Sequence, residues 1–290
     1  MSAVSTAVLL LSCPDRPGVV AATATFLADH GGNIVHAEQH VDAGGNGTDA
    51  SFFQRIEFEL EGFGLTRDEI TDAFAPIATA FDMRADVHFT DVATPTAIMV
   101  SRQSHCLYDL LTRWRGGELP MDLRVVVSNH DDHRDIVEHM GVEFVHQPVT
   151  PETKPAQEEA VLEVLDRCGV EFVVLARYMQ ILSDRFVATR PSGIINIHHS
   201  FLPSFVGANP YRQAHDRGVK LIGATAHYAT ADLDEGPIIE QETVHVTHRD
   251  DVARLTARGR DLETVVLARA VRAHLEHRVL VHGRRTIVFS

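Results

Sequence analysis

Three polar residues in the second half of the chain have the side-chain types that attack on a carbonyl group requires. Asn196 and His198 lie at the end of the apolar run 194–198, which predicts a short buried strand. Side chains alternate along a strand, so these two point to the same face of it. Asp234 follows in the turn 232–237. An amide that polarises a carbonyl, an imidazole that stabilises an oxyanion and a carboxylate that accepts a proton together indicate acyl-group chemistry.

The elements that must position these residues alternate between strand and helix patterns. Expected strands cover 97–101, 123–128, 143–145, 172–175, 194–198, 221–228 and 237–246. Expected helices cover 106–115, 133–139, 155–168, 183–189, 210–217 and 251–274. This alternation is typical of a doubly wound, mostly parallel sheet. Two further runs, 279–282 and 286–289, predict a hairpin. Pro95 lies in a predicted linker, 91–95, so the catalytic domain is expected to cover 96–290.

The sequence around the three polar residues resembles a known family. Four segments occur in a fixed order, namely 196–203 (NIHHSFLP), 211–214 (YRQA), 223–228 (GATAHY) and 233–239 (LDEGPII). Together they are similar to the formyltransferase fold, which is Rossmann-like and handles 10-formyltetrahydrofolate. The resemblance implies that Asn196, His198 and Asp234 are the catalytic trio.

The first strand–helix turn of this domain, 101–107, bears on the acceptor of the formyl group. Phosphate-binding turns need glycines, so that backbone amides can approach the anion. The glycinamide ribonucleotide formyltransferases have Gly-Ser-Asn at this point, whereas this chain has Ser104, His105 and Cys106. An acceptor that carries a phosphate is therefore disfavoured, which leaves water. With His199 directly after His198, the chain resembles the formyltetrahydrofolate deformylases, the hydrolytic members of the family.

Two other functions stay open. A formyltransferase to an amine that lacks a phosphate would use the same trio. An amino-acid sensor without catalysis would use only the N-terminal part of the chain.

The resemblance also assigns residues to the substrate. Segment 175–182 follows a buried strand and implies backbone contacts with the pterin ring. The predicted substrate-binding residues are Leu175, Met179, Gln180, Ile181, Leu182, Ser104, His105, Cys106 and His199. Cys106 is either an activated thiolate or a packing residue. Glu263 lies either where the transferases bind their amine acceptor or on a purely structural helix face.

No cofactor is expected, because tetrahydrofolate is the product and 10-formyltetrahydrofolate the substrate. A zinc site formed by His198, His199 and His227 is conceivable, since strands can converge. The carboxylate of Asp234 makes a metal unnecessary for the chemistry, so we predict none.

Residues 1–92 predict a separate small α+β domain. The expected strands are 7–12, 33–42, 52–60 and 83–89, with helices from 19 to the glycine pair 31–32 and over 67–81. This βαββαβ order is typical of a ferredoxin-like domain.

The opening of this domain, through 12–20 (SCPDRPGVV) and 31–34 (GGNI), resembles an ACT domain. ACT domains commonly pair through their sheets and bind small amino acids. The resemblance therefore implies a homo-oligomer, a dimer or a tetramer, with a regulatory amino-acid site. Its predicted residues are Asp15, Arg16, Gly18, Asn33 and Ile34. The alternative is that Gly18 and Asn33 serve only the turns and the domain serves only assembly.

Composition restricts the remaining partners. The chain has 290 residues, of which 44% are hydrophobic, so one large or two modest domains with real cores are expected. A formal net charge of −14 argues against nucleic acid or an anionic membrane as the main partner. Cys13, Cys106 and Cys168 are too far apart for a disulfide framework or a CxxC zinc site. The beginning of the chain lacks the pattern of a signal peptide, and no apolar run has membrane-spanning length, so we expect a cytoplasmic protein.

Overall fold

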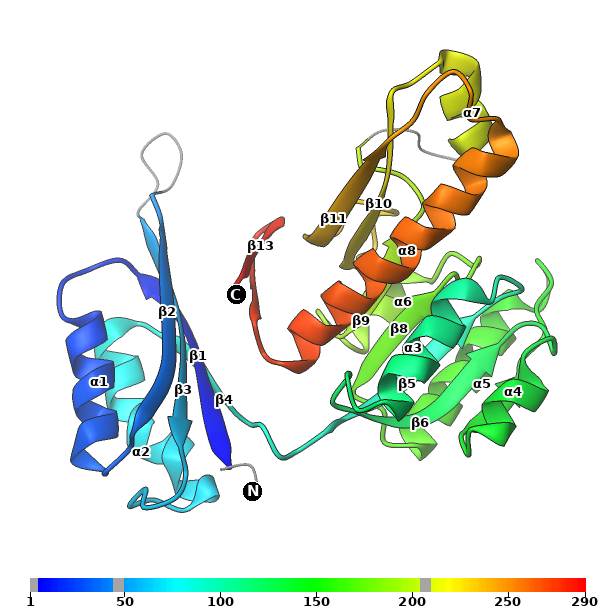
Figure 1. Cartoon of the computed structure of the whole chain (residues 1–290). Coiled ribbons are helices and arrows are strands. Elements are labelled where there is room, and N and C mark those ends of the chain that lie inside the picture. The colour runs from blue at the N-terminus through cyan, green and yellow to red at the C-terminus, as the bar shows by residue number, and fades with distance from the viewer. Residues whose placement is uncertain (1–4, 44–49, 204–209) are drawn as a thin grey trace. The chain divides into compact units, whose positions relative to one another are not determined.

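The structure is a computed structural model that describes residues 5–43, 50–203 and 210–290 (Figure 1). The chain divides into two compact units. The first contains Met1–Ala93, Glu276–Leu280 and Ile287–Ser290, and the second contains Thr94–Leu275 and Val281–Thr286. Two short segments after residue 275 thus group with the first unit, whereas the sequence assigned all of 96–290 to one catalytic domain.

The first unit is a four-stranded antiparallel sheet with two helices on one face (Figure 1). Its elements are β1 (Thr6–Pro14), α1 (Val19–Asp29), β2 (Ile34–Asp42), β3 (Ser51–Glu59), α2 (Arg67–Phe81) and β4 (Arg84–Phe89). The strand order is β2-β3-β1-β4, which confirms the predicted βαββαβ fold.

The central strand β1 is buried on both faces. Leu9 and Leu11 pack with the two helices. Val8 and Leu10 point the other way, because side chains alternate along a strand, and pack against Phe289 near the far end of the sequence. Residues 276–280 and 287–290 therefore complete the core of the first unit.

The second unit is built on a seven-stranded sheet. Its strands are β5 (Thr94–Val100), β6 (Met121–Ser128), β7 (Glu143–His146), β8 (Phe172–Ala176), β9 (Ile194–His198), β10 (Leu221–Tyr228) and β11 (Ile238–His245). Its helices are α3 (His105–Arg115), α4 (Arg134–His139), α5 (Lys154–Arg167), α6 (Asp184–Ala188), α7 (Pro210–Arg217) and α8 (Val252–Leu275). A hairpin of β12 (Val279–His282) and β13 (Arg285–Val288) follows.

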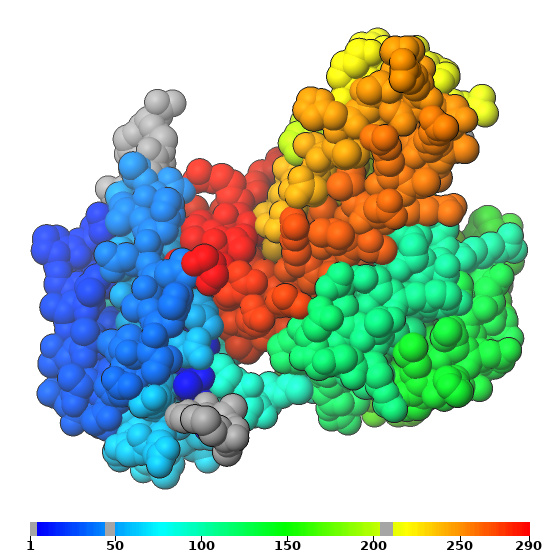
Figure 2. Space-filling view, viewed as in Figure 1, coloured from blue at the N-terminus to red at the C-terminus, as the bar shows by residue number. Residues whose placement is uncertain are grey.

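The sheet order is β11-β10-β9-β8-β5-β6-β7. Strands β5 to β9 pair in parallel, and β10 and β11 are antiparallel to their neighbours, which confirms a mostly parallel sheet. Helix α8 packs along this sheet and beside α3 (Figure 1 and Figure 2). None of the helices in the described part of the chain is both long and apolar enough to cross a membrane.

The chain leaves β5 for β6 and β7 on one side and returns to β8 on the other side. Such a reversal opens a crevice at the carboxyl ends of the strands, where α/β folds bind ligands. The carboxyl ends of β5, β8 and β9 meet there, because these strands are parallel. The candidate site lies at this edge.

The predicted linker 91–95 is wrong in its last two residues. Strand β5 begins at Thr94 and includes Pro95, which pairs with Asp122 of β6. A proline is tolerated at the start of a strand, where it removes only one ladder donor. The Pro95 carbonyl still accepts a hydrogen bond from the Glu171 amide, at 2.9 Å.

Candidate active site

A cavity of about 730 Å³ lies at the carboxyl ends of β8 and β9. Its size falls within the range of small-molecule sites, about 300–1,000 Å³. Nine of the predicted site residues line it, namely Leu175, Met179, Gln180, Ile181, Leu182, Asn196, His198, His199 and Asp234. Ser104, His105 and Cys106 are not among its lining residues, and His105 contacts the cavity wall through Glu263.

Asn196 lies opposite His227 of β10, and the two side chains meet. Asn196 Nδ2 is 3.2 Å from His227 Nε2. The other ring nitrogen of His227 is 2.9 Å from the Tyr228 carbonyl, which can only accept a hydrogen bond. The proton of a neutral His227 therefore lies on Nδ1, and Nε2 accepts from Asn196. One N–H of the Asn196 amide stays available for a ligand in the cavity.

Two members of the predicted trio, His198 and Asp234, are in direct contact. His198 Nδ1 is 3.1 Å from Asp234 Oδ2, and Asp234 Oδ1 is 3.6 Å from His227 Nε2. Burial raises the pKa of Asp234, but its contacts with His198 and His227 outweigh burial and hold this pKa well below its usual value. The carboxylate is therefore ionised throughout the neutral range.

The turn that presents Asp234 has two special backbone positions. Asp234 has a φ of 57°, a left-handed conformation that Asp and Asn adopt more readily than most residues. At Gly236, a Cβ atom would lie 1.8 Å from the carbonyl oxygen of Tyr228. Only glycine lets the turn approach β10 this closely, and this approach brings the carboxylate to the histidines.

His198 has one ring nitrogen without a partner. The side chain is 5% exposed, and its Nε2 has no hydrogen-bond partner within the described residues. A buried polar atom without a partner is costly, so such atoms are kept where a ligand satisfies them. With Nδ1 directed to Asp234, Nε2 is the atom that can meet a substrate oxygen.

His199 has the opposite ring orientation. Its Nδ1 is 2.7 Å from Arg177 Nη1, and a guanidinium can only donate, so the proton of His199 lies on Nε2. Burial, followed by the charges of Arg177 and His198, lowers the pKa of His199 to about 4. His199 is therefore neutral at neutral pH, and its ring stacks on His198 with centroids 4.9 Å apart.

A buried ion pair forms the wall of the cavity beside His199. Arg177 Nε is 3.3 Å from Glu263 Oε2 and donates to Gln103 Oε1 at 3.1 Å. His105 Nε2 donates to Glu263 Oε2 at 2.7 Å, and the Tyr211 hydroxyl donates to Glu263 Oε1 at 2.6 Å. Burial raises the pKa of Glu263, but these contacts outweigh burial and keep this pKa below its usual value.

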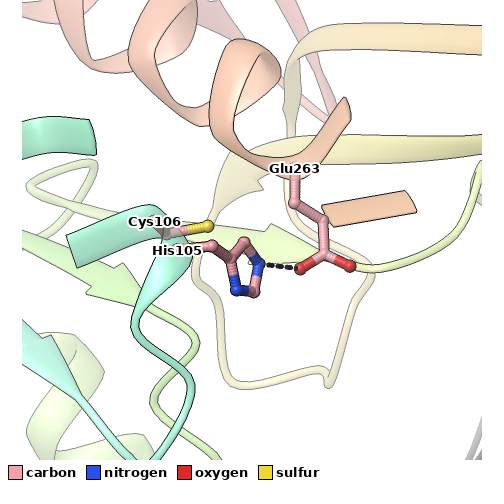
Figure 3. A group of neighbouring side chains, drawn as sticks. All are labelled: His105, Cys106 and Glu263. Carbon is pink, nitrogen blue, oxygen red and sulfur yellow. Dashed lines mark hydrogen bonds and ion pairs between the residues drawn. The ribbon is translucent and has the colours of Figure 1, made fainter. Parts of the chain in front are cut away.

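His105, Cys106 and Glu263 have the donor types of a metal site, and Figure 3 shows them side by side. Burial, with the nearby charge of Glu263, raises the pKa of the Cys106 thiol well above its usual value. A protonated thiol is a poor metal ligand and a poor nucleophile. The Arg177 guanidinium also already neutralises Glu263. These observations favour packing for Cys106 and ion pairing for Glu263.

The loop after β8 forms an apolar part of the cavity. Ser101, at the end of β5, accepts a hydrogen bond from the Met179 amide at 2.9 Å and so fixes this loop. Met179, Ile181 and Leu233 line the cavity, although each is more than half exposed. Exposed apolar side chains grouped at a cavity mark a ligand surface rather than a core. This surface suits a partly apolar ligand.

The predicted amino-acid site combines the loop before α1 with residues at the start of β2. Gly18 begins α1 with a φ of 99°, and Arg16 donates to the Ala80 carbonyl at 2.7 Å. Asn33 instead donates to the Glu59 carboxylate at 3.0 Å. Asp15 pairs through its backbone with Ala50, and Ile34 is partly exposed on the edge strand β2.

Sequence reasoning missed Arg177 and Tyr211, and assigned to His227 only a conceivable zinc role. His227 could have been found, because residues that alternate on the strand next to Asn196 face the same cavity. Arg177 has a φ of 63°, which no pattern in the sequence indicates.

Two family profiles match the chain. Residues 95–271 match the formyl transferase family, and residues 7–61 match the ACT domain family. Among solved structures, a formyltetrahydrofolate deformylase from Pseudomonas syringae is 46% identical with a TM-score of 0.96, and the match covers 100% of this chain and 96% of that one. A glycinamide ribonucleotide transformylase from Symbiobacterium toebii is 32% identical with a TM-score of 0.64, and the match covers 68% of this chain and 95% of that one.

Curated relatives agree over nearly the full length. The formyltetrahydrofolate deformylase of Synechocystis is 52% identical over 98% of this chain and 99% of its own length. That of Bacillus subtilis is 47% identical over 97% of this chain and 93% of its own length. Identity at this level across both units shows that the chain belongs to the formyltetrahydrofolate deformylase family of enzymes.

Proposed function

We propose that the chain hydrolyses 10-formyltetrahydrofolate to formate and tetrahydrofolate. The observation that carries this proposal is the convergence of Asn196, His198 and Asp234 on one cavity. The carboxylate is ionised, and one imidazole nitrogen has no partner among the described residues. The relatives named for this reaction support the choice of substrate.

Asn196 and His198 act on the formyl oxygen. The free N–H of the Asn196 amide, held by His227, donates to this oxygen and polarises the carbonyl. His198, with its Nδ1 proton held by Asp234, is a donor through Nε2 when protonated. That donor stabilises the negative charge that develops on the oxygen.

Asp234 handles the proton of the attacking water. The water oxygen forms a bond to the formyl carbon, and its proton passes to Asp234 as the bond forms. The tetrahedral intermediate then breaks its C–N bond, the folate nitrogen takes the proton from Asp234, and formic acid leaves and ionises to formate. A carboxylate of low pKa mainly orients the water and accepts its proton late, which suits an attack helped by two donors on the oxygen.

The apolar loop after β8 receives the folate. Met179, Ile181 and Leu233 provide the surface for the flat pterin ring, and the backbone of 175–182 provides hydrogen bonds at its edge. The cavity residue Gln180 is neutral, so it offers no charge to the glutamate carboxylates of the substrate. No cofactor or metal takes part in the proposed reaction.

Transfer of the formyl group to an amine without a phosphate is the second candidate, because it uses the same trio. It differs in one measurable requirement, a second substrate. Purified protein given only 10-formyltetrahydrofolate is expected to release equal amounts of formate and tetrahydrofolate. Turnover that begins only when an amine is added would support the transferase instead.

The first unit is proposed to be regulatory. The match of residues 7–61 to ACT domains supports a homo-oligomer, a dimer or a tetramer, with a small amino acid bound near Arg16 and Asn33. Control of the reaction requires that this amino acid bind active and inactive states with different affinity. Hydrolysis without control would drain one-carbon units, which gives a regulatory unit a purpose.

A further inference from the structure

The buried pair of Arg177 and Glu263 lies on the cavity wall, and the proposed steps of hydrolysis do not use it. Both side chains line the cavity, yet Arg177 is 7% exposed and Glu263 is 1% exposed. Removing two charges from water is expensive, and a buried ion pair is often no more stabilising than an apolar pair of the same size. An ion pair kept at the cavity wall therefore calls for a role other than stability.

The backbone of Arg177 points to the same conclusion. Its φ of 63° is left-handed, a conformation in which arginine is uncommon and glycine is relaxed. The position would accept glycine without strain, and glycine would leave the space of the guanidinium open to the cavity. Strained backbone at a cavity is typical of positions that serve function.

Both oxygens of the Glu263 carboxylate already have partners in the protein. Oε1 accepts from the Tyr211 hydroxyl, and Oε2 receives His105 and Arg177. A primary amine that entered this side of the cavity would need such a carboxylate to accept a hydrogen bond from its N–H group. Here the partner is already neutralised by the protein itself.

A glycine in α8 supports the arrangement. A Cβ at Gly259 would lie 2.0 Å from the Tyr211 hydroxyl, so the absence of a side chain makes room for the tyrosine. A glycine inside a helix is less stabilising than an alanine there. Gly259 therefore lowers the stability of the helix, but it makes room for the hydrogen bond from Tyr211 to Glu263.

We propose that Arg177, paired with Glu263, determines the acceptor. Its guanidinium fills the part of the cavity next to Glu263, where an amine would otherwise bind, and so restricts the reaction to water. This inference rests on the proposed hydrolysis. Water needs little space, whereas an amine needs both the space of the guanidinium and a carboxylate that can accept from its N–H group. The same fold serves glycinamide ribonucleotide transformylases, so the choice between water and amine must lie in side chains of this kind.

Without the Arg177 guanidinium, the protein is predicted to transfer the formyl group to an amine. The nitrogen of a neutral primary amine forms a bond to the formyl carbon, and the bond from that carbon to the folate nitrogen breaks. The amine loses one proton and the folate nitrogen gains one. The products are a formamide and tetrahydrofolate, with no oxidant or reductant.

The test is Arg177→Gly in the full chain, assayed with 10-formyltetrahydrofolate and glycinamide. The α-amino group of such a compound titrates near pH 8, so an assay at about that pH supplies free amine. Formate and N-formylglycinamide are quantified by mass spectrometry. The wild-type protein is expected to give formate only. In the variant the ratio of formamide to formate is expected to rise at least about tenfold, the low end of what fit to a pocket decides.

Two further variants identify the cause. Arg177→Gly combined with Glu263→Gln keeps the space but removes the carboxylate, and it is expected to lose the formamide again. Arg260→Ala removes an exposed arginine that lines the same cavity, and it is expected to form no formamide. If Arg177→Gly does not fold, Arg177→Asn replaces it, because Asn also tolerates a positive φ.

The outcomes separate this inference from the proposed function. Formate release by the wild type without formamide from Arg177→Gly or Arg177→Asn would overturn the role of Arg177 alone. Wild-type formylation of glycinamide at a rate near that of hydrolysis would overturn it as well. Absence of formate from the wild type without an amine would overturn the hydrolysis itself.

Discussion

Replacing Asp234 with Asn tests the proposed mechanism most directly. Asn has nearly the shape of Asp and also adopts a φ near the 57° found here, so the turn should be unchanged. Its side-chain oxygen can still accept from His198 Nδ1, which lies 3.1 Å from the carboxylate. The variant lacks only the negative charge and the ability to take a proton.

The expected loss follows from that change. A positioned base contributes about 10²–10⁴ in rate, and no other carboxylate among the described residues that line the cavity is free, because Glu263 is fully engaged. Asp234→Asn should therefore reduce kcat by about 10³, equivalent to about 4 kcal/mol in the barrier. Folate affinity should change little, since Met179 and Ile181 are unaltered.

The assay measures formate release and tetrahydrofolate formation under saturating substrate, with folate affinity from calorimetry. Asp232→Asn is the matched control, because Asp232 lies two residues away with its side chain exposed. The control should keep wild-type kcat. A kcat for Asp234→Asn within a few-fold of the wild type would refute the assignment of Asp234 as the proton acceptor.

The same variant has a signature in stability. The pKa of Asp234 in the folded protein lies below its unfolded value of about 3.9, so its contribution to stability is complete above about pH 4 and is lost as the pH falls further. The difference in unfolding free energy between wild type and Asp234→Asn should therefore narrow below about pH 4. Urea unfolding at a series of pH values measures this; a gap that widens on acidification would contradict the direction of the pKa shift.

Three other predictions concern single contacts. Burial and, after it, the Arg177 charge lower the pKa of His199, so Arg177→Gly should raise this pKa from about 4 toward its ordinary value; NMR titration of the His199 ring would show this, and an unchanged titration would contradict it. Gly259→Ala should destabilise the protein by about 1–3 kcal/mol, because its Cβ overlaps Tyr211, and urea unfolding measures the loss, whereas wild-type stability would show that the ring moves freely. If a small amino acid binds the first unit, calorimetry on the full chain should detect it and Asn33→Ala should abolish both binding and any change in rate; no binding by any common amino acid would leave the unit a role in assembly only.

The trio was predictable because its geometry follows from simple periodicity. Asn196 and His198 are two apart on a strand, so they share a face wherever that strand lies. The arrangement of Asp234 depended on the resemblance, since the close approach of its turn at Gly236 is a tertiary contact. Arg177 could not be predicted, because its role depends on a left-handed backbone and on a glutamate 86 residues further along the chain.

The grouping of residues 276–280 and 287–290 with the first unit was also hidden from the sequence. The runs 279–282 and 286–289 predict a hairpin, and the structure contains one. Their periodicity says nothing of which core they join. Which core they join is decided by packing between residues far apart in the sequence, since Phe289 packs against Val8 and Leu10.

This grouping has a consequence for the order in which the protein matures on the ribosome. Arg55 of β3 donates to the backbone carbonyl of His277, at a sequence separation of 222 residues. One face of the sheet in the first unit therefore stays uncovered when its own strands leave the ribosome. Its apolar residues Val8, Leu10 and Phe53 can be buried only after Phe289 has been synthesised. Domains that fold as they emerge normally finish in sequence order. Here the earliest-made unit is completed after the catalytic one, so a chain that stops short of residue 276 carries an unfinished apolar face that chaperones and proteases can recognise.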